Sequence, residues 1–276
     1  RLGQGGIPCP AALVQAARPG QNLLLDDGRL LVQVAEADGA ALQCTVARGG
    51  TLQSRKSLAA PGLTVASPTL TEEDLQNLQL AGACGVTGVM LPFVRGAEDI
   101  RTLRRALEQV GAGQIRIFAK IENMTGLHRL DEILPLADVV VIARGDLGNA
   151  MPLWELPRAQ TLIASKCRAA KRPFMVSTQM LHSMHHAAVP TRAEVTDVYQ
   201  AARSGADYLL LTGETAVGEY PVMLLDDVLS ELDPRRQEYV LNRIRGGQVF
   251  ITCCENDRLD TLLNGKVFHV KNGEVL

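Results

Sequence analysis

Two residues of opposite charge stand at the end of an apolar segment, 116–121, that we expect to be a β-strand. Lys120 is the second-last residue of this segment, and Glu122 is the first residue after the segment. Because side chains alternate along a strand, both would lie on the same face. An ammonium group beside a carboxylate suits phosphoryl transfer: the carboxylate can hold Mg²⁺, and the amine can offset charge on the moving phosphoryl group. The alternative is a structural salt bridge at the rim of a sheet.

A second polar group, Arg144-Gly145-Asp146, follows the next expected strand, 138–143. Asp146 could supply a second carboxylate to the same metal ion, and the backbone amide of Gly145 could bind an anion where a short helix begins. Taken alone, the segment could equally be an ordinary turn between a strand and a helix. Its occurrence one unit after Lys120 and Glu122 favours the functional interpretation.

A third polar group, Ser177-Thr178-Gln179, follows the expected strand at 173–178. The Thr178 hydroxyl could hydrogen-bond an enolate or relay a proton through water. The alternative is that Thr178 caps the next helix.

The elements that must position these groups alternate regularly from residue 68 onward. Apolar segments separated by helical patterns predict a parallel sheet of five strands, whose carboxyl ends share one edge and commonly carry the active site. The expected strands are 88–93, 116–121, 138–143, 173–178 and 208–211. Before residue 68, apolar segments on either side of Asp26-Asp27-Gly28 predict a β-hairpin.

Composition narrows the class of protein. Hydrophobic residues make up 46% of the 276 residues and charged residues 21%, which is typical of a globular domain with a core. The formal net charge of −2 provides no basis for nucleic-acid binding. The six cysteines form no CxxC pair, and no apolar run reaches the roughly 18 residues of a membrane span. We therefore expect a cytoplasmic protein with reduced thiols and no membrane association.

The motifs in this order resemble pyruvate kinase over about residues 20–222. The match excludes that family's first barrel strands and its C-terminal regulatory domain. The motifs that carry the resemblance are Phe-Ala-Lys-Ile-Glu-Asn (118–123), Ala-Arg-Gly-Asp-Leu-Gly (143–148), Ser-Thr-Gln-Met-Leu (177–181), Pro-Thr-Arg-Ala-Glu (190–194) and Leu-Thr-Gly-Glu-Thr-Ala (211–216). One departure is Pro92, where the family usually has a small hydroxyl residue before Phe93.

The resemblance implies an α/β fold in which residues 67–222 form the later strands of a (β/α)₈ barrel and residues 1–66 the end of an inserted β domain. It also implies metal ligation by Glu122 and Asp146, stabilisation of the moving phosphoryl group by Lys120, and proton transfer near Thr178. Arg144, Gly145 and Asp146 would lie on the side of the substrate carboxylate. The implied cofactors are Mg²⁺ or Mn²⁺, with K⁺ in many members, and the implied assembly is a homotetramer.

The C-terminal stretch has a second resemblance. Residues 218–276 are similar to the end of the recombination protein RecF, a DNA-binding ATPase, in which Asp226 would support Mg²⁺ and Asp227 would polarise water. No Gly-x-x-x-x-Gly-Lys-Ser/Thr loop occurs in the chain, so residues 223–276 would not be an ATPase alone. We expect residues 223–276 to form a separate tail, and hypothesise a chimera joined at 218–222. Nucleic acid is not the expected partner despite this tail.

The function predicted from these patterns is pyruvate kinase: transfer of the phosphoryl group of phosphoenolpyruvate to ADP, giving pyruvate and ATP in glycolysis. Two alternatives remain. One is a Mg²⁺-dependent carbon–carbon lyase on a related barrel, which would need no amine at Lys120 for a phosphoryl group. The other is a non-catalytic chimera with a DNA-repair ATPase tail.

Overall fold

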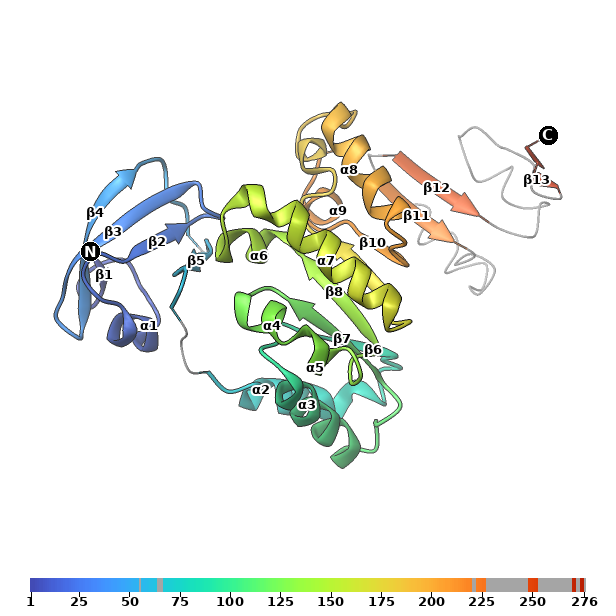
Figure 1. Ribbon diagram of the computed structural model, residues 1–276, viewed down its shortest axis with the longest axis horizontal. Coiled ribbons are helices and arrows are strands. Elements are labelled where there is room, and N and C mark those ends of the chain that lie inside the picture. The colour runs from blue at the N-terminus through green and yellow to red at the C-terminus, as the bar shows by residue number, and fades with distance from the viewer. Residues whose placement is uncertain are drawn as a thin grey trace. The chain divides into compact units, whose positions relative to one another are not determined.

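Figure 1 shows a computed structural model of the chain, in which two compact units are distinguished. The structure describes residues 1–54, 56–63, 67–219, 222–226, 248–252, 270–271 and 274–275. One unit comprises residues 1–178 and 198–210, and the other comprises residues 179–197 and 211–276. The three-part division at residues 66 and 222 stays a prediction.

The first part of the chain forms an antiparallel sheet with strand order β1-β4-β3-β2-β5. Its strands are β1 (Leu2–Gly3), β2 (Asn22–Leu25), β3 (Leu30–Ala37), β4 (Ala41–Arg48) and β5 (Leu58–Ala59). The expected hairpin is confirmed: β2 pairs with β3, and Asp26, Asp27 and Gly28 between them all have positive φ. Helix α1 (Ala11–Ala16) contributes Leu13 and Val14 to the apolar core beneath this sheet.

A second sheet, of five parallel strands, follows in the same unit, and its order β10-β9-β8-β7-β6 matches the order of the strands along the chain. Its strands are β6 (Gly88–Leu91), β7 (Arg116–Ile121), β8 (Val139–Ala143), β9 (Phe174–Ser177) and β10 (Tyr208–Leu210). All five expected strands are confirmed, with ends that differ by up to two residues. Every residue of the central strand β8 is buried, as expected for a parallel strand covered on both faces.

Helices connect these strands, and Figure 1 shows them beside the sheet. They are α2 (Glu72–Ala81), α3 (Ala97–Gln109), α4 (Met124–His128), α5 (Leu130–Ile133), α6 (Arg144–Ala150), the 3₁₀ turn η1 (Leu153–Glu155), α7 (Leu156–Ala169) and α8 (Arg192–Arg203). The sequence predicts one helix near 126–134, but the structure has two short helices because the backbone at Arg129 leaves the helical region between them. The sequence also predicts Thr71 as the N-cap of α2, and this is confirmed: Thr71 exchanges hydrogen bonds with Asp74.

The other described segments belong to the second unit. The 3₁₀ turn η2 (His182–His185) and helix α9 (Gly213–Ala216) are followed by a parallel pair, β11 (Val222–Asp226) and β12 (Gln248–Thr252), and by an antiparallel pair, β13 (Val270–Lys271) and β14 (Glu274–Val275). The sequence also predicts strands near 223–227 and 249–252, which are confirmed, and a helix near 234–244, which lies outside the described residues. No helix in the described part of the chain is long and apolar enough to cross a membrane.

Glu194 connects two elements of the second unit through a single carboxylate. It closes a capping box at the start of α8, accepting hydrogen bonds from the amide and hydroxyl of Thr191 at 2.8 and 2.9 Å. It also accepts hydrogen bonds from the amide and hydroxyl of Ser183 in η2. Partial burial raises the pKa of Glu194, but these hydrogen bonds outweigh burial and lower the pKa from 4.5 to about 2.

We expect Glu194→Gln to lower the free energy of unfolding by about 1 kcal/mol at pH 7, because a neutral amide accepts these hydrogen bonds more weakly. Since the pKa is depressed in the folded state, this contribution is complete above pH 4.5 and declines as the pH falls toward 2. Urea unfolding of both proteins at pH 7 and pH 3 should therefore give a smaller difference at pH 3. Glu108→Gln, at an exposed position late in α3, is the control. An equal difference at both pH values would contradict the assignment.

Candidate functional site

Lys120 and Glu122 meet at the carboxyl end of β7. Lys120 Nζ lies 2.6 Å from Glu122 Oε1, and the Glu122 side chain is fully buried. The other carboxylate oxygen, Oε2, accepts a hydrogen bond of 2.7 Å from the backbone amide of Phe93. Oε1 has no hydrogen-bond partner among the described residues, because its contact with Lys120 is an ion pair without hydrogen-bond geometry. One buried oxygen of Glu122 therefore remains available to a further cation.

Asp146 lies in the first turn of α6, which follows the neighbouring strand β8. Burial, followed by the negative charge of Glu122, raises the pKa of Asp146 to about 6, against the opposing charge of Lys120. Lys120, Glu122 and Asp146, which the sequence predicted as one centre, are therefore brought together. A divalent cation near both groups would relieve the repulsion between the two carboxylates.

The donor set of this centre fits a hard divalent cation. The described residues contain no group of three or more His, Cys, Asp and Glu side chains that could hold a metal ion. Mg²⁺, however, is commonly bound by one or two carboxylates and completes its octahedron with water and substrate phosphates. The available oxygen of Glu122 and the neighbouring Asp146 match this kind of site, and they do not match a metal cage built from protein ligands alone.

Thr178 follows β9, the next strand of the sheet, in a strained conformation. Its φ is +69°, and Gln179 after it has φ of +55°, a region that residues with side chains rarely adopt. Arg144 supports this conformation by donating hydrogen bonds from Nε and Nη2 to the carbonyl of Thr178, at 3.3 and 3.0 Å. Thr178 is thus not an ordinary helix cap, and Arg144, which follows β8, holds it in position.

The amide of Gly145 contacts Thr178 as well. It donates a hydrogen bond of 2.8 Å to Thr178 Oγ1, which in turn donates one of 2.6 Å to the carbonyl of Ser177. A hydroxyl has two acceptor positions, so Thr178 Oγ1 keeps one for a ligand or water. The sequence predicted that the Gly145 amide would face an anion. In the structure this amide orients the Thr178 hydroxyl.

The backbone amide of Phe93 is a component of the site that sequence reasoning did not identify. Phe93 lies two residues after β6, separated from it by Pro92, and it has a positive φ of 51°. In the sequence, Phe93 is the last residue of the expected strand 88–93, whose carboxyl end shares the edge with the other polar groups. Main-chain donors are the same at every residue except proline, so residue type does not reveal them.

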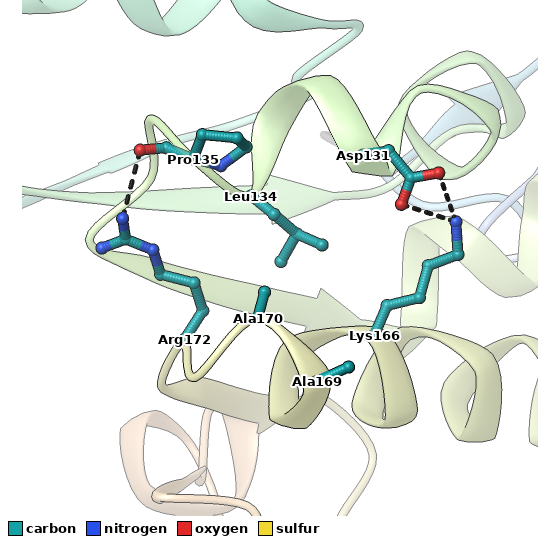
Figure 2. A pocket seen from close by; sticks show the side chains of 7 residues that line it. All are labelled: Asp131, Leu134, Pro135, Lys166, Ala169, Ala170 and Arg172. Carbon is teal, nitrogen blue, oxygen red and sulfur yellow. Dashed lines mark hydrogen bonds and ion pairs between the residues drawn. The ribbon is translucent and has the colours of Figure 1, made fainter.

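A hollow of about 420 Å³ lies elsewhere, between α5 and α7 (Figure 2). Lys166 pairs with Asp131 on one side of it at 2.6 Å, and Arg172 donates a hydrogen bond to the carbonyl of Pro135 on the other. Its lining residues precede β8 and β9 in the chain, so the hollow lies toward the amino ends of these strands. The residues predicted to carry chemistry follow the carboxyl ends, which separates them from this hollow.

Comparison with known proteins identifies a family for most of the chain. Residues 10–225 match the family described as pyruvate kinase, barrel domain. The chain is 40% identical over 220 residues to a pyruvate kinase of Aeropyrum pernix, covering 79% of this chain and 48% of that protein. It is 39% identical over 210 residues to one of Mycobacterium tuberculosis, covering 76% and 44%, and 40% identical over 213 residues to one of Geobacillus stearothermophilus, covering 76% and 36%.

The chain thus spans about half the length of the curated relatives it matches, or less. The matched region includes the hairpin at Asp26, the five parallel strands and the loops that follow these strands. On the strength of this match, which takes in more than half of its residues, the chain belongs to the pyruvate kinase family.

Proposed function

We propose that this chain carries the phosphoryl-transfer centre of a pyruvate kinase. In the proposed reaction, phosphoenolpyruvate, ADP and a proton give pyruvate and ATP, the last step of glycolysis. The observation that supports this best is the convergence of Lys120, Glu122 and Asp146 after two adjacent strands. A carboxylate pair with an ammonium group beside it combines a cation site with a separate positive charge, as phosphoryl transfer requires.

In this proposal, Glu122 and Asp146 would hold Mg²⁺ or Mn²⁺, which would supply positive charge to offset that of the substrate. Lys120 remains partly exposed at the mouth of the site, with 24% of its side chain accessible. Its ammonium group can therefore move from Glu122 to the phosphoryl group in flight. A flexible side chain with a compact point charge is suited to that movement.

Thr178, Arg144 and Gly145 would bind the end of the substrate that lies away from the phosphoryl group. We propose that the substrate carboxylate binds beside Arg144, Gly145 and Asp146, and that Thr178 lies next to the enolate carbon that takes up a proton. The remaining acceptor position of Thr178 Oγ1 can bind the water that delivers this proton. The carbonyl of Ser177 and the amide of Gly145 fix where that position points.

Four broader features complete the proposal, and membership of this family is what supports them. The five parallel strands would be part of a (β/α)₈ barrel, K⁺ would assist the reaction, the complete protein would be a homotetramer, and it would be cytoplasmic. Nucleic acid is not a proposed partner. The matched strand order, with each strand next to its predecessor, supports the barrel because barrel strands are arranged in this way.

We also propose that residues from about 218 to 276 derive from a RecF-like protein, joined to the kinase portion near 218–222. The match to the pyruvate kinase family ends at residue 225, close to the expected junction. Sequencing a single continuous DNA molecule across the junction tests this. We expect the reading frame to be interrupted there; an intact natural frame would refute the junction.

We expect Lys120→Met to lower metal-dependent phosphoryl transfer from phosphoenolpyruvate to ADP by about 10²- to 10³-fold, because it removes a charge that acts on the transition state. Lys166→Met is the matched control, since Lys166 also forms an ion pair of 2.6 Å but lies on the outer helix α7. It should retain the activity of the unchanged chain. Full activity in Lys120→Met, or absence of turnover in the unchanged chain, would contradict the proposal. Carbon–carbon cleavage that survives Lys120→Met would favour the lyase.

We further expect oxalate, a mimic of enolpyruvate, to bind in the presence of Mg²⁺ and not in its absence. Asp146→Ala should abolish this binding because it removes one of the two carboxylates that hold the ion. Isothermal titration of the 276-residue chain measures binding whether or not the chain turns over substrate. Asp131→Ala, a carboxylate on α5, is the control. Oxalate binding that persists without Mg²⁺, or in Asp146→Ala, would place the anion elsewhere.

A further inference from the structure

The loop at residues 92–95, between β6 and α3, contacts the metal-binding carboxylate through its backbone. The amide of Phe93 donates to Glu122 Oε2 at 2.7 Å. Phe93 reaches this position with φ of +51°, although 55% of its side chain is exposed to solvent. A bulky residue adopts such a conformation only where its surroundings impose it, at a cost of about 1–3 kcal/mol. Other contacts must therefore hold the 92–95 loop in place.

One set of contacts holds Val94, which is fully buried. Its amide donates to the carbonyl of Lys120 at 3.2 Å, and its carbonyl accepts from Asn123 Nδ2 at 3.2 Å. Gly126 in α4 approaches so closely that a β-carbon there would lie 2.2 Å from the Val94 carbonyl oxygen. The 92–95 loop is thus packed directly against the segment that carries Lys120 and Glu122.

A second set of contacts centres on Asp99 in α3, a carboxylate that is 8% exposed. Its Oδ2 accepts from the amide and Nε of Arg95 at 2.8 and 3.0 Å. Its Oδ1 accepts from Arg95 Nη2 at 2.7 Å and from the hydroxyl of Thr69 at 2.6 Å. Both oxygens of Asp99 are therefore used, and they fix the main chain and the side chain of Arg95 together.

We propose that Asp99 is a positioning residue for the metal site: through Arg95 it holds the 92–95 loop so that the Phe93 amide fixes one oxygen of Glu122 and directs the other toward the cation. This inference rests on the proposed function, since it assigns Glu122 as a metal ligand. Asp99 touches neither Glu122 nor Lys120, so its effect is exerted through the backbone of the loop.

The physical basis is the competition for Glu122 between Lys120 and the cation. With Oε2 bound by the Phe93 amide, the carboxylate cannot rotate to meet Lys120 with both oxygens. Once that amide moves away, Glu122 can rotate to meet Lys120 with both oxygens, and this two-oxygen ion pair would lower the affinity for the cation. Groups that orient metal ligands in this way typically change metal affinity by about 10- to 100-fold when they are mutated.

Asp99→Asn tests the proposal, because an amide keeps one accepting oxygen where Asp99 uses two. We expect the Kd for Mn²⁺, measured from the electron paramagnetic resonance signal of free Mn²⁺ without substrate, to rise about tenfold. Asp138→Asn is the matched control. Asp138 also accepts hydrogen bonds from an arginine, Arg104, and from a backbone amide, that of Ile117, at 2.7 Å each. It lies at the amino end of β8, however, and the proposed site lies at the carboxyl ends of the strands. This variant should bind Mn²⁺ as the unchanged chain does.

Gly126→Ala gives a second, independent displacement of the 92–95 loop and should also weaken Mn²⁺ binding; it keeps the test decisive if Asp99→Asn does not fold. Glu122→Gln shows which binding belongs to this site. If the unchanged chain binds no Mn²⁺ that Glu122→Gln removes, the proposed metal site fails and the inference with it. If that binding is present and a folded Asp99→Asn or Gly126→Ala retains it fully, or Asp138→Asn weakens it equally, the inference alone is refuted.

Discussion

Glu122 keeps a carboxylate almost entirely out of water, and a buried charge is stable only where other groups replace the hydrogen bonds and counter-charge that water would supply. Lys120 supplies the charge and the Phe93 amide supplies one hydrogen bond. The remaining oxygen is left without a hydrogen bond, and the nearby Asp146 adds repulsion. This incomplete compensation is the main constraint on the site, and in the proposed function a bound cation would complete it.

Two strained residues, Phe93 and Thr178, border this centre from different strands, and both are held in the same manner. Each follows the end of a parallel strand with a positive φ, and an arginine stabilises each locally: Arg95 within the Phe93 loop and Arg144 at the Thr178 carbonyl. In both cases the strain brings a group to the site that a regular strand would direct elsewhere: a main-chain amide at Phe93 and a hydroxyl at Thr178. The arginines therefore contribute to order at the site as well as to charge.

Much of this architecture could be predicted from the sequence. Strands β6 to β10 are continuous apolar segments, and covered parallel strands are recognisable by that property. The convergence of Lys120, Glu122 and Asp146 followed from placing each after a strand of one parallel sheet. Strand β4 was harder to identify, because outward-facing polar residues such as Thr45 and Arg48 break its apolar pattern. Positive φ at Thr178 could not be predicted, since tertiary hydrogen bonds and not the local sequence impose it. The hydrogen bonds from Ser183 to Glu194 could not be predicted either, because they join residues eleven positions apart in the chain.

The sequential order of the parallel sheet also has a consequence for how the protein folds. Each strand from β7 to β10 pairs with the strand that precedes it in the chain, so every pairing closes a loop of similar, modest length. Pairing between successive strands allows the sheet to grow by one unit at a time from its first strand. Glu122 and Asp146 would then come together as soon as β8 joins β7, while Thr178 must await β9. During synthesis the two carboxylates would therefore meet before the hydroxyl that completes the site has been added to the sheet.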